Sequence, residues 1–163
     1  MKKVIVIGSP GSGKSTFARA LRDVTSLPLF HLDMLGWNAD KTTVPKEIFD
    51  ERLAAVLARD EWIIDGNYTR TIEPRLCACD TVFLLDYPVE LCLAGVAARR
   101  GKPRADMPWI EEDVDKEFLD FIRSFPTERL PRIKAMLAAH PELSVVVFTS
   151  REQSEEYLRR LAE

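Results

Sequence analysis

The chain has 163 residues, 46% of them hydrophobic and 30% charged, and its formal net charge at pH 7 is −3. This length suits one domain with a sizeable core, and the composition excludes a disordered chain, which would have fewer large apolar residues and more net charge. A weakly acidic protein also differs from a general nucleic-acid binder, which needs many cations to neutralise phosphates. We therefore expect one folded domain over residues 1–163 and disfavour direct binding to nucleic acid.

The apolar runs and the cysteines indicate in which cellular compartment the protein is expected. No run of about 18 or more apolar residues occurs, so the sequence predicts no membrane-spanning helix. The cysteines Cys77, Cys79 and Cys92 are odd in number and lack the spacing of a disulfide framework. His31 and His140 are far from them in sequence, which disfavours a zinc site and favours reduced thiols. We expect a cytoplasmic protein without a membrane partner.

The N-terminal half of the chain alternates apolar strands with amphipathic helices. Residues 3–7 are a β-branched run, typical of a strand that is covered on both faces. Residues 15–24 follow as a helix, because apolar side chains recur at helical spacing. Residues 29–32 predict a second strand and residues 33–44 a loop. Pro45 predicts the first position of another helix, where its missing N–H costs nothing.

Two further buried strands lie in the middle of the chain. Residues 62–64 and 81–85 are short apolar runs, and each is followed by an aspartate and turn-forming residues. Residues 89–99 are rich in alanine and leucine and predict a helix. Residues 101–108 contain a glycine and two prolines and therefore predict a mobile loop.

The C-terminal third continues the alternation. It predicts helices over residues 111–125 and 128–139, a strand over residues 143–148, and a last helix that Ser150 and Gln153 begin as a capping box. Five apolar strands separated by helices predict an α/β protein whose parallel sheet has helices on both faces. Ligands of such sheets bind at the carboxyl ends of the strands, so the polar residues that follow strands are the functional candidates.

A glycine-rich motif follows the first predicted strand. Residues 8–16 read Gly-Ser-Pro-Gly-Ser-Gly-Lys-Ser-Thr and match G-x-x-x-x-G-K-[ST], the Walker A motif, which predicts a three-layer P-loop NTPase fold. Its glycines let N–H groups turn inward around phosphates, and the next helix points its positive end at them. Lys14 is expected to reach the β- and γ-phosphates, and Ser15 to bind Mg²⁺. The residues expected to contact ATP here are Gly8, Pro10, Gly11, Ser12, Gly13, Lys14, Ser15 and Thr16.

An aspartate and an arginine follow the third predicted strand. Asp65 lies where a carboxylate suits Mg²⁺, the water bound to it, or the substrate; the alternative is a turn-forming aspartate before Gly66. Arg70 can hold a phosphate or carboxylate of the acceptor through its fork of N–H donors, or it is a solvated arginine at a helix start. Both residues are candidates for substrate binding.

The second predicted strand ends at His31, Leu32 and Asp33. Asp33 either accepts a proton or a hydrogen bond from an acceptor hydroxyl, or forms a side-chain turn. His31 alternates with apolar strand residues, which favours a packed, hydrogen-bonded histidine. Trp37 either stacks on an acceptor ring or caps the core. Asp33 is thus the candidate for contact with the acceptor.

A local basic cluster interrupts the acidic chain at Arg99, Arg100 and Arg104. Phosphoryl transfer needs positive charge around the migrating group, and a loop that carries arginines can bring this charge and exclude water as it closes. The alternative is a solvated basic turn at a helix C-terminus, where cations complement the helix dipole. We expect a short lid around residues 100–108.

These motifs, in this order, resemble those of the nucleoside monophosphate kinase group of P-loop proteins, which includes adenylate kinase. The chain is most similar to bacterial proteins called DNA topology modulation proteins, and the likeness covers nearly all of it. It rests on residues 8–15, 31–33, 62–68, 100–102, 104–107 and 118–126. The resemblance implies ATP as phosphate donor, with its base over a loop after the fifth strand, where Ser150 and Arg151 lie.

The chain also departs from adenylate kinases. Lys14, Ser15 and Thr16 stand where those enzymes have Lys-Gly-Thr, and Arg70 follows Asp65 by five residues, where their arginine follows by four. Residues 31–44 replace the segment that holds AMP in those enzymes. The sequence therefore predicts an ATP- and Mg²⁺-dependent phosphotransferase with a small-molecule acceptor that it leaves open. The alternative is an ATPase or a nucleotide-switched regulatory protein, with or without an effect on DNA topology.

Overall fold

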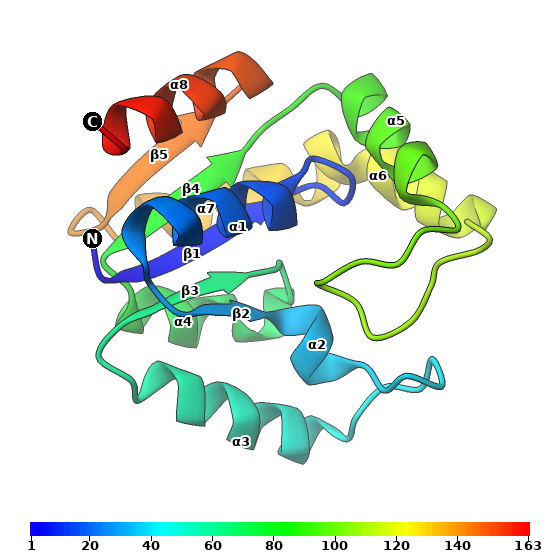
Figure 1. Cartoon of the computed structure of the whole chain (residues 1–163), viewed down its shortest axis with the longest axis horizontal. Helices are drawn as coiled ribbons and strands as arrows, with labels where there is room; N and C mark the ends of the chain where they lie inside the picture. The colour runs from blue at the N-terminus through cyan, green and yellow to red at the C-terminus, as the bar shows by residue number, and fades with distance from the viewer.

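The computed structural model describes all 163 residues. Its centre is a five-stranded parallel sheet with the strand order β2-β3-β1-β4-β5 (Figure 1). The strands are β1 (Lys3–Gly8), β2 (Leu29–His31), β3 (Trp62–Asp65), β4 (Thr81–Leu85) and β5 (Ser144–Phe148). The predicted parallel α/β fold is confirmed, and each of the five predicted strands is present to within one residue at either end.

Eight helices and one short 3-10 turn connect the strands. They are α1 (Lys14–Thr25), α2 (Leu32–Gly36), α3 (Lys46–Leu57), η1 (Thr69–Thr71), α4 (Ile72–Ala78), α5 (Val89–Arg99), α6 (Lys116–Glu128), α7 (Leu130–Ala138) and α8 (Arg151–Leu161). Ser150 caps α8 by accepting a hydrogen bond from the backbone N–H of Gln153, as predicted. None of the helices combines the length and the apolar character that a membrane crossing requires.

The sequence prediction missed two short helices and misplaced one helix start. The predicted loop after β2 contains α2, whose first residue, Leu32, is completely buried. The seven residues of α4 contain only one pair of buried apolar side chains, Ile72 and Leu76, and this is too short for a periodic signal. The helix predicted over residues 111–125 begins only at Lys116, because the side chain of Asp115 caps it by accepting from the N–H of Phe118.

Two hydrophobic cores flank the sheet. Ile5 and Ile7 of β1 pack with α3, α4 and α7 in one core, whereas Val4 and Val6 pack with α1 and α5 in the other. Successive side chains of a strand point to opposite faces, so a strand that is apolar throughout is buried on both sides. Figure 1 shows α1 and α8 on one face of the sheet and α4 and α7 on the other.

The strand register brings three strand ends together beside the loop that joins β1 to α1. Val6 of the central strand is aligned with Asp65 of β3, and Asp65 is aligned with His31 of β2. On the other side, Gly8 is aligned with Leu85 of β4. The carboxyl ends of β1, β2 and β3 therefore form one rigid edge, as expected for a ligand site in a parallel sheet.

Candidate functional site

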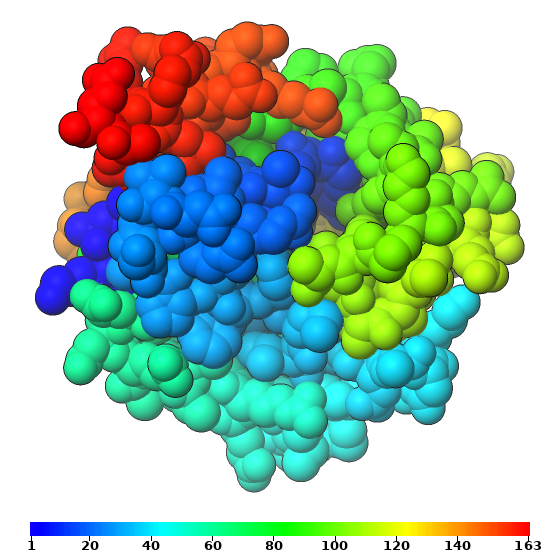
Figure 2. Space-filling view, viewed as in Figure 1, coloured from blue at the N-terminus to red at the C-terminus, as the bar shows by residue number.

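A cavity of about 1000 Å³ opens at this edge of the sheet. Its walls are the P-loop (residues 8–16), α2, and the segment over residues 100–115 between α5 and α6, which we call the lid segment. Figure 2 shows its mouth as a hollow between the blue atoms of the N-terminal part and the yellow-green atoms of the lid segment. This volume is at the upper end of the range for small-molecule sites and has room for more than one ligand group.

The P-loop presents its backbone to the cavity. Gly13 is the N-cap of α1 with φ 92°, a conformation that glycine adopts without strain, and no side chain caps the helix there. The N–H groups of the first helical turn therefore remain available to an anion. The ammonium group of Lys14 donates to the carbonyl of Ser9 over 3.1 Å. Burial lowers the pKa of Lys14, although Asp65 and Asp33 partly offset it.

Two glycines bring the P-loop into close contact with α5. Gly11 has φ 79°, and a Cβ atom there would lie 2.0 Å from the carbonyl oxygen of Cys92. A Cβ atom at Gly95 would lie 2.1 Å from the carbonyl oxygen of Gly11. Sequence analysis identified Gly11 through the motif but missed Gly95, which no motif marks. This backbone contact holds the phosphate-binding loop in a fixed position against α5.

We expect Gly95→Ala to destabilise the protein, although alanine is the better helix former by about 1 kcal/mol. The methyl group would meet backbone that cannot rotate away, and such overpacking costs about 1–3 kcal/mol. Urea unfolding followed by far-UV circular dichroism measures the difference. Ala97→Ser, on an exposed position of the same helix, should stay within about 0.5 kcal/mol of the wild type. Equal stability of Gly95→Ala and the wild type would show that the P-loop can move away from the methyl group without loss of folding free energy.

The loop after β3 is held by two side chains that sequence analysis did not single out. The side-chain amide of Asn67 accepts from the N–H of Gly8 over 3.1 Å and donates to the carbonyl of Gly8 over 2.7 Å. Arg75 of α4 is completely buried and donates to the carbonyls of Gly66, Asn67, Tyr68 and Thr71. Burial lowers its pKa to about 10. These bonds fix the end of β3 against the start of the P-loop.

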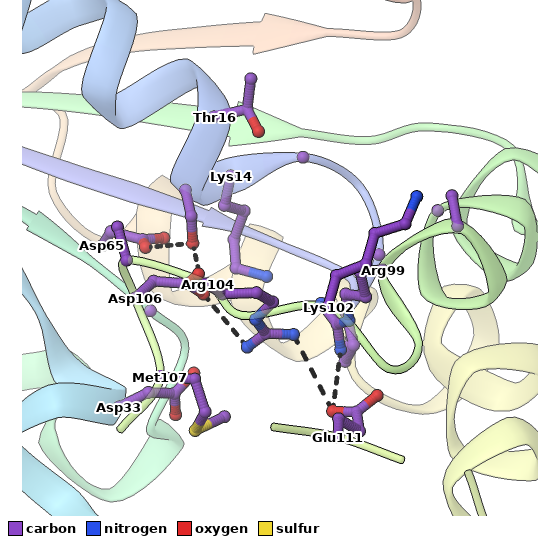
Figure 3. Close-up of a pocket in the computed structure, with 18 of the residues that line it drawn as sticks. Lys14, Thr16, Asp33, Asp65, Arg99, Lys102, Arg104, Asp106, Met107 and Glu111 are labelled. Atoms are coloured by element: carbon purple, nitrogen blue, oxygen red, sulfur yellow. Dashed lines mark hydrogen bonds and ion pairs between the residues drawn. The ribbon is translucent and has the colours of Figure 1, made fainter. Parts of the chain in front are cut away.

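An oxygen-rich cluster lies beneath the lid segment. The hydroxyl of Ser15 is 2.6 Å from Oδ2 of Asp65 and 2.9 Å from Oδ2 of Asp106. Figure 3 shows that Asp65 and Asp106 lie close together below Lys14. Nδ1 of His31 is 2.7 Å from the same Oδ2 of Asp65. Oδ1 of Asp65 is buried and has no hydrogen-bond partner. Carboxylate and hydroxyl oxygens are the ligands that Mg²⁺ prefers, so these residues fit the metal that the motif predicts.

Asp106 is the member of this cluster that sequence analysis did not assign. It lies in the lid segment and is 7% exposed. Burial opposes its ionisation, but Arg104 and the Ser15 hydroxyl together outweigh burial and hold the pKa of Asp106 below its ordinary value. Asp106 is therefore available as a carboxylate at neutral pH. Nothing in the sequence places residue 106 near residue 15, because the lid segment has no periodic pattern that fixes its course.

Asp33 lies at the other end of the cavity, near Met107 in Figure 3. Its Oδ1 accepts a hydrogen bond from the hydroxyl of Tyr68 over 2.8 Å, and Tyr68 stacks on Phe49. Burial raises the pKa of Asp33, whereas the bond from Tyr68 and the charge of Lys14 act in the opposite direction. A carboxylate with a raised pKa is a better proton acceptor, as general-base catalysis requires.

Tryptophans form the wall next to Asp33. Trp37 and Trp109 meet edge to face with 5.6 Å between ring centroids, and both line the cavity. Trp109 comes from the lid segment, and its indole N–H is buried without a partner. Trp37 thus lines the cavity, where both of its predicted roles, stacking on an acceptor ring or capping the core, stay open.

Two of the three predicted lid arginines enter the cavity. Arg104 is 3.2 Å from Asp106 and 3.8 Å from Glu111, and Arg99 is 3.6 Å from Glu111. Nε of Arg99, and Nε and Nη1 of Arg104, are buried without hydrogen-bond partners. Burial lowers the pKa of Arg99, and the charge of Arg104 adds to this effect. Buried cations with unused donors form a site for an anion. Glu111 was not identified from the sequence.

Five predicted site residues lie outside the cavity lining, and two of them, Gly8 and Ser12, belong to the P-loop. Arg100 donates to the carbonyl of Glu112 and pairs with Asp113, and its side chain is 58% exposed. Arg70 forms a two-bond pair with Asp50 on the surface. Ser150 is used as the cap of α8, whereas its neighbour Arg151 does line the cavity. The remaining candidates all reach the lining.

A second group of potential ligands lies away from this cavity. Glu73, Cys77 and His140 offer ligand atoms that all lie within 4.8 Å of one another. The distance of His140 from the cysteines along the sequence therefore does not keep them apart in space. Both nitrogens of His140 already lie within 3 Å of carboxylates, at 2.7 Å from Glu73 and 2.9 Å from Glu142. These contacts raise the pKa of His140, and they already engage both ring nitrogens.

Solved structures of kinases share this fold. A shikimate kinase from Bacteroides thetaiotaomicron matches with a TM-score of 0.60 at 16% identity, over 97% of this chain and 94% of its own. One from Acinetobacter baumannii, in complex with shikimate, matches with a TM-score of 0.64 at 16% identity, over 99% and 91%. A sugar kinase from a Janibacter species matches with a TM-score of 0.52 at 18% identity, over 98% and 91%.

No family model and no curated protein sequence matches the chain. At these identities the structural matches show the fold alone, which is that of P-loop kinases. The predicted P-loop fold is therefore confirmed. The matches lend no support to the predicted similarity to DNA topology modulation proteins.

Proposed function

We propose that the protein is a small-molecule kinase that transfers the γ-phosphate of ATP to a hydroxyl group of its acceptor. The observation that carries this proposal is the shared cavity: the phosphate-binding loop and the Asp33–Tyr68 pair line the same space of about 1000 Å³. A protein that only hydrolyses or senses ATP has no need of a second compartment with its own carboxylate and aromatic wall. The kinases with the same fold support this reading.

In the proposed reaction, the acceptor oxygen forms a bond to the γ-phosphorus while the bond from that phosphorus to the β–γ bridging oxygen breaks. The proton of the acceptor hydroxyl passes to the carboxylate of Asp33, and ADP leaves. Lys14 and the P-loop N–H groups hold the β- and γ-phosphates, and Arg99 and Arg104 face the charge that develops on the transferred group. Mg²⁺, held by Ser15 and Asp65, would neutralise phosphate charge when bound.

The direct test is ADP formation from Mg-ATP across a panel of acceptors. Sugars and small hydroxy acids such as shikimate come first, since kinases for these share the fold; nucleosides and nucleoside monophosphates follow. We expect one class to stimulate turnover strongly, and Asp33→Asn to remove this stimulation while leaving ATP binding in place. A slow rate that no acceptor changes, and that Asp33→Asn does not alter, would instead support an ATPase or a nucleotide-switched regulator.

Tyr68→Phe should move the acidic limb of the pH profile of kcat/KM to higher pH. The Tyr68 hydroxyl stabilises the ionised form of Asp33, so its loss raises the pKa of Asp33 further. Since the protonated base is inactive, the activity then appears only at a higher pH. Well above this limb the loss should be only about fivefold, as for one hydrogen bond.

The matched control for this prediction is Tyr87→Phe. Tyr87 is buried and, like Tyr68, loses one hydrogen bond, which its hydroxyl forms with Ser154 over 2.8 Å, but it has no contact with Asp33. Its pH profile should coincide with that of the wild type. If Tyr68→Phe leaves the acidic limb unmoved, Asp33 is not the group whose ionisation limits the reaction.

A further inference from the structure

One carboxylate of the lid segment, that of Asp106, lies between the arginines of this segment and the P-loop. Asp106 reaches past Arg104 to within 2.9 Å of the P-loop hydroxyl of Ser15 (Figure 3). The same hydroxyl is 2.6 Å from Asp65 at the end of β3. A hydroxyl group has one proton and can donate to only one of the two carboxylates. Hydrogen bonding alone therefore does not explain why both converge on it.

The spacing of these oxygens suits a divalent cation. Magnesium binds oxygens at about 2.0–2.1 Å in an octahedron, so neighbouring ligand oxygens are about 2.9 Å apart. The separations from Ser15 to Asp65 and to Asp106 lie close to this value. In addition, Oδ1 of Asp65 is buried without any partner, in a side chain that is 5% exposed. An unpaired carboxylate oxygen in the interior is costly unless a cation or a donor satisfies it.

We propose that Asp106 is a ligand of the divalent cation, so that the metal itself ties the lid segment to the P-loop. This inference rests on the proposed function, because the cation is the one that accompanies the nucleotide. Asp65 is the last residue of β3 and Ser15 lies in the first turn of α1, whereas Asp106 belongs to a segment without helix or strand. Binding of the cation therefore joins a fixed half-site to a movable one.

If Asp106 binds the cation, the cation also holds the lid arginines in position. Arg104 is two residues from Asp106 and pairs with it over 3.2 Å, and Glu111 joins Arg104 to Arg99. When Asp106 is fixed by the cation, Arg104 is fixed too, and its unused N–H donors stay inside the cavity. Binding of the cation then stabilises the closed position of the lid segment, which excludes water at the time of transfer.

Binding of Mn²⁺ to the full-length protein, followed by the electron paramagnetic resonance signal of free Mn²⁺ in the presence of ADP, tests this inference without turnover. We expect Asp106→Asn to weaken Mn²⁺ binding by at least about tenfold, as loss of a ligand contact should. Binding of ADP in EDTA should remain within about twofold of the wild type. Glu112→Gln, which removes a carboxylate from an exposed lid position outside the cavity lining, is the matched control and should bind Mn²⁺ as the wild type does.

Trypsin digestion provides the second readout, because Arg100 and Arg104 offer cleavage sites in the lid segment. Mn²⁺ with ADP should slow this cleavage in the wild type and in Glu112→Gln but not in Asp106→Asn. The inference is overturned if Asp106→Asn and the wild type bind Mn²⁺ with equal affinity. It is also overturned if Asp106→Asn binds ADP more tightly than the wild type in EDTA, because Asp106 would then only repel the phosphates. If the wild type itself binds neither ADP nor Mn²⁺, the proposed function fails, and the inference fails with it.

Discussion

Lys14→Ala is expected to abolish turnover while the protein stays folded. Lys14 is the one lysine of the P-loop and lies in the cavity among carboxylates. In the proposed complex its charge offsets that of the β- and γ-phosphates. Preorganised groups that act on transition-state charge in this way are worth about 10³-fold in rate or more. We therefore expect acceptor-dependent ADP formation to fall by at least this factor.

The stability of Lys14→Ala follows from the same burial. Removing the ammonium group from water is unfavourable, and the nearby carboxylates offset this cost only in part, so burial lowers the pKa of Lys14. Its only hydrogen bond is to the carbonyl of Ser9. Alanine is also the best helix former at this first position of α1. The variant should unfold at the same urea concentration as the wild type or at a higher one, because the wild type holds a buried charge that Asp65 and Asp33 compensate only in part.

The control for this variant is Lys134→Ala, which removes a lysine from the surface of α7. Lys134 pairs with Asp86 over 2.9 Å and its side chain is 52% exposed, so its loss should change neither turnover nor stability appreciably. If folded Lys14→Ala keeps most of the acceptor-dependent activity, the P-loop is not the phosphate site. A variant that fails to fold would be replaced by Lys14→Met, which retains the aliphatic stem of the side chain.

The parts of the site that could be predicted from the sequence are those with local signals. The P-loop is a contiguous motif, and Asp33 and Asp65 each follow an apolar strand directly. Because parallel strands end at one edge, their side chains meet without further information. Asp33 and Asp65 thus reach the cavity as predicted. All five strands could likewise be predicted, because each is a short apolar run and therefore a local signal.

The parts that could not be predicted depend on contacts across long stretches of sequence. Gly95 is an ordinary residue of α5 until the backbone of Gly11 rests on it. An arginine in a short helix is normally predicted to be solvated, yet the side chain of Arg75 is completely buried and donates hydrogen bonds only to carbonyl groups. Asp106 and Glu111 belong to the irregular lid segment, whose path is determined by their own contacts with Ser15, Arg99 and Arg104. No periodicity announces any of these contacts.

Arg104→Ala should lower kcat by about 10²–10³-fold, the range for loss of one donor that faces transition-state charge. The side chain of Arg104 is 11% exposed, and its Nε and Nη1 are buried without hydrogen-bond partners. These unused donors point to an anion that arrives with the substrate. The value of KM for ATP should change much less than kcat, because Lys14 and the P-loop N–H groups bind the phosphates in the ground state as well. Steady-state kinetics at saturating Mg²⁺ separates the two effects.

Arg100→Ala provides the comparison that decides how the basic cluster acts. It removes the same charge from the same lid segment, but Arg100 is 58% exposed and paired with Asp113. If the cluster worked only by raising the local density of positive charge, the two variants would lose similar activity, and both losses would shrink as salt screens the exposed charges. Since transfer requires donors held against the migrating group, we expect Arg100→Ala to stay within about threefold of the wild type. The ratio of the two effects thus measures placement separately from charge, and a ratio near one would remove Arg104 from the catalytic residues.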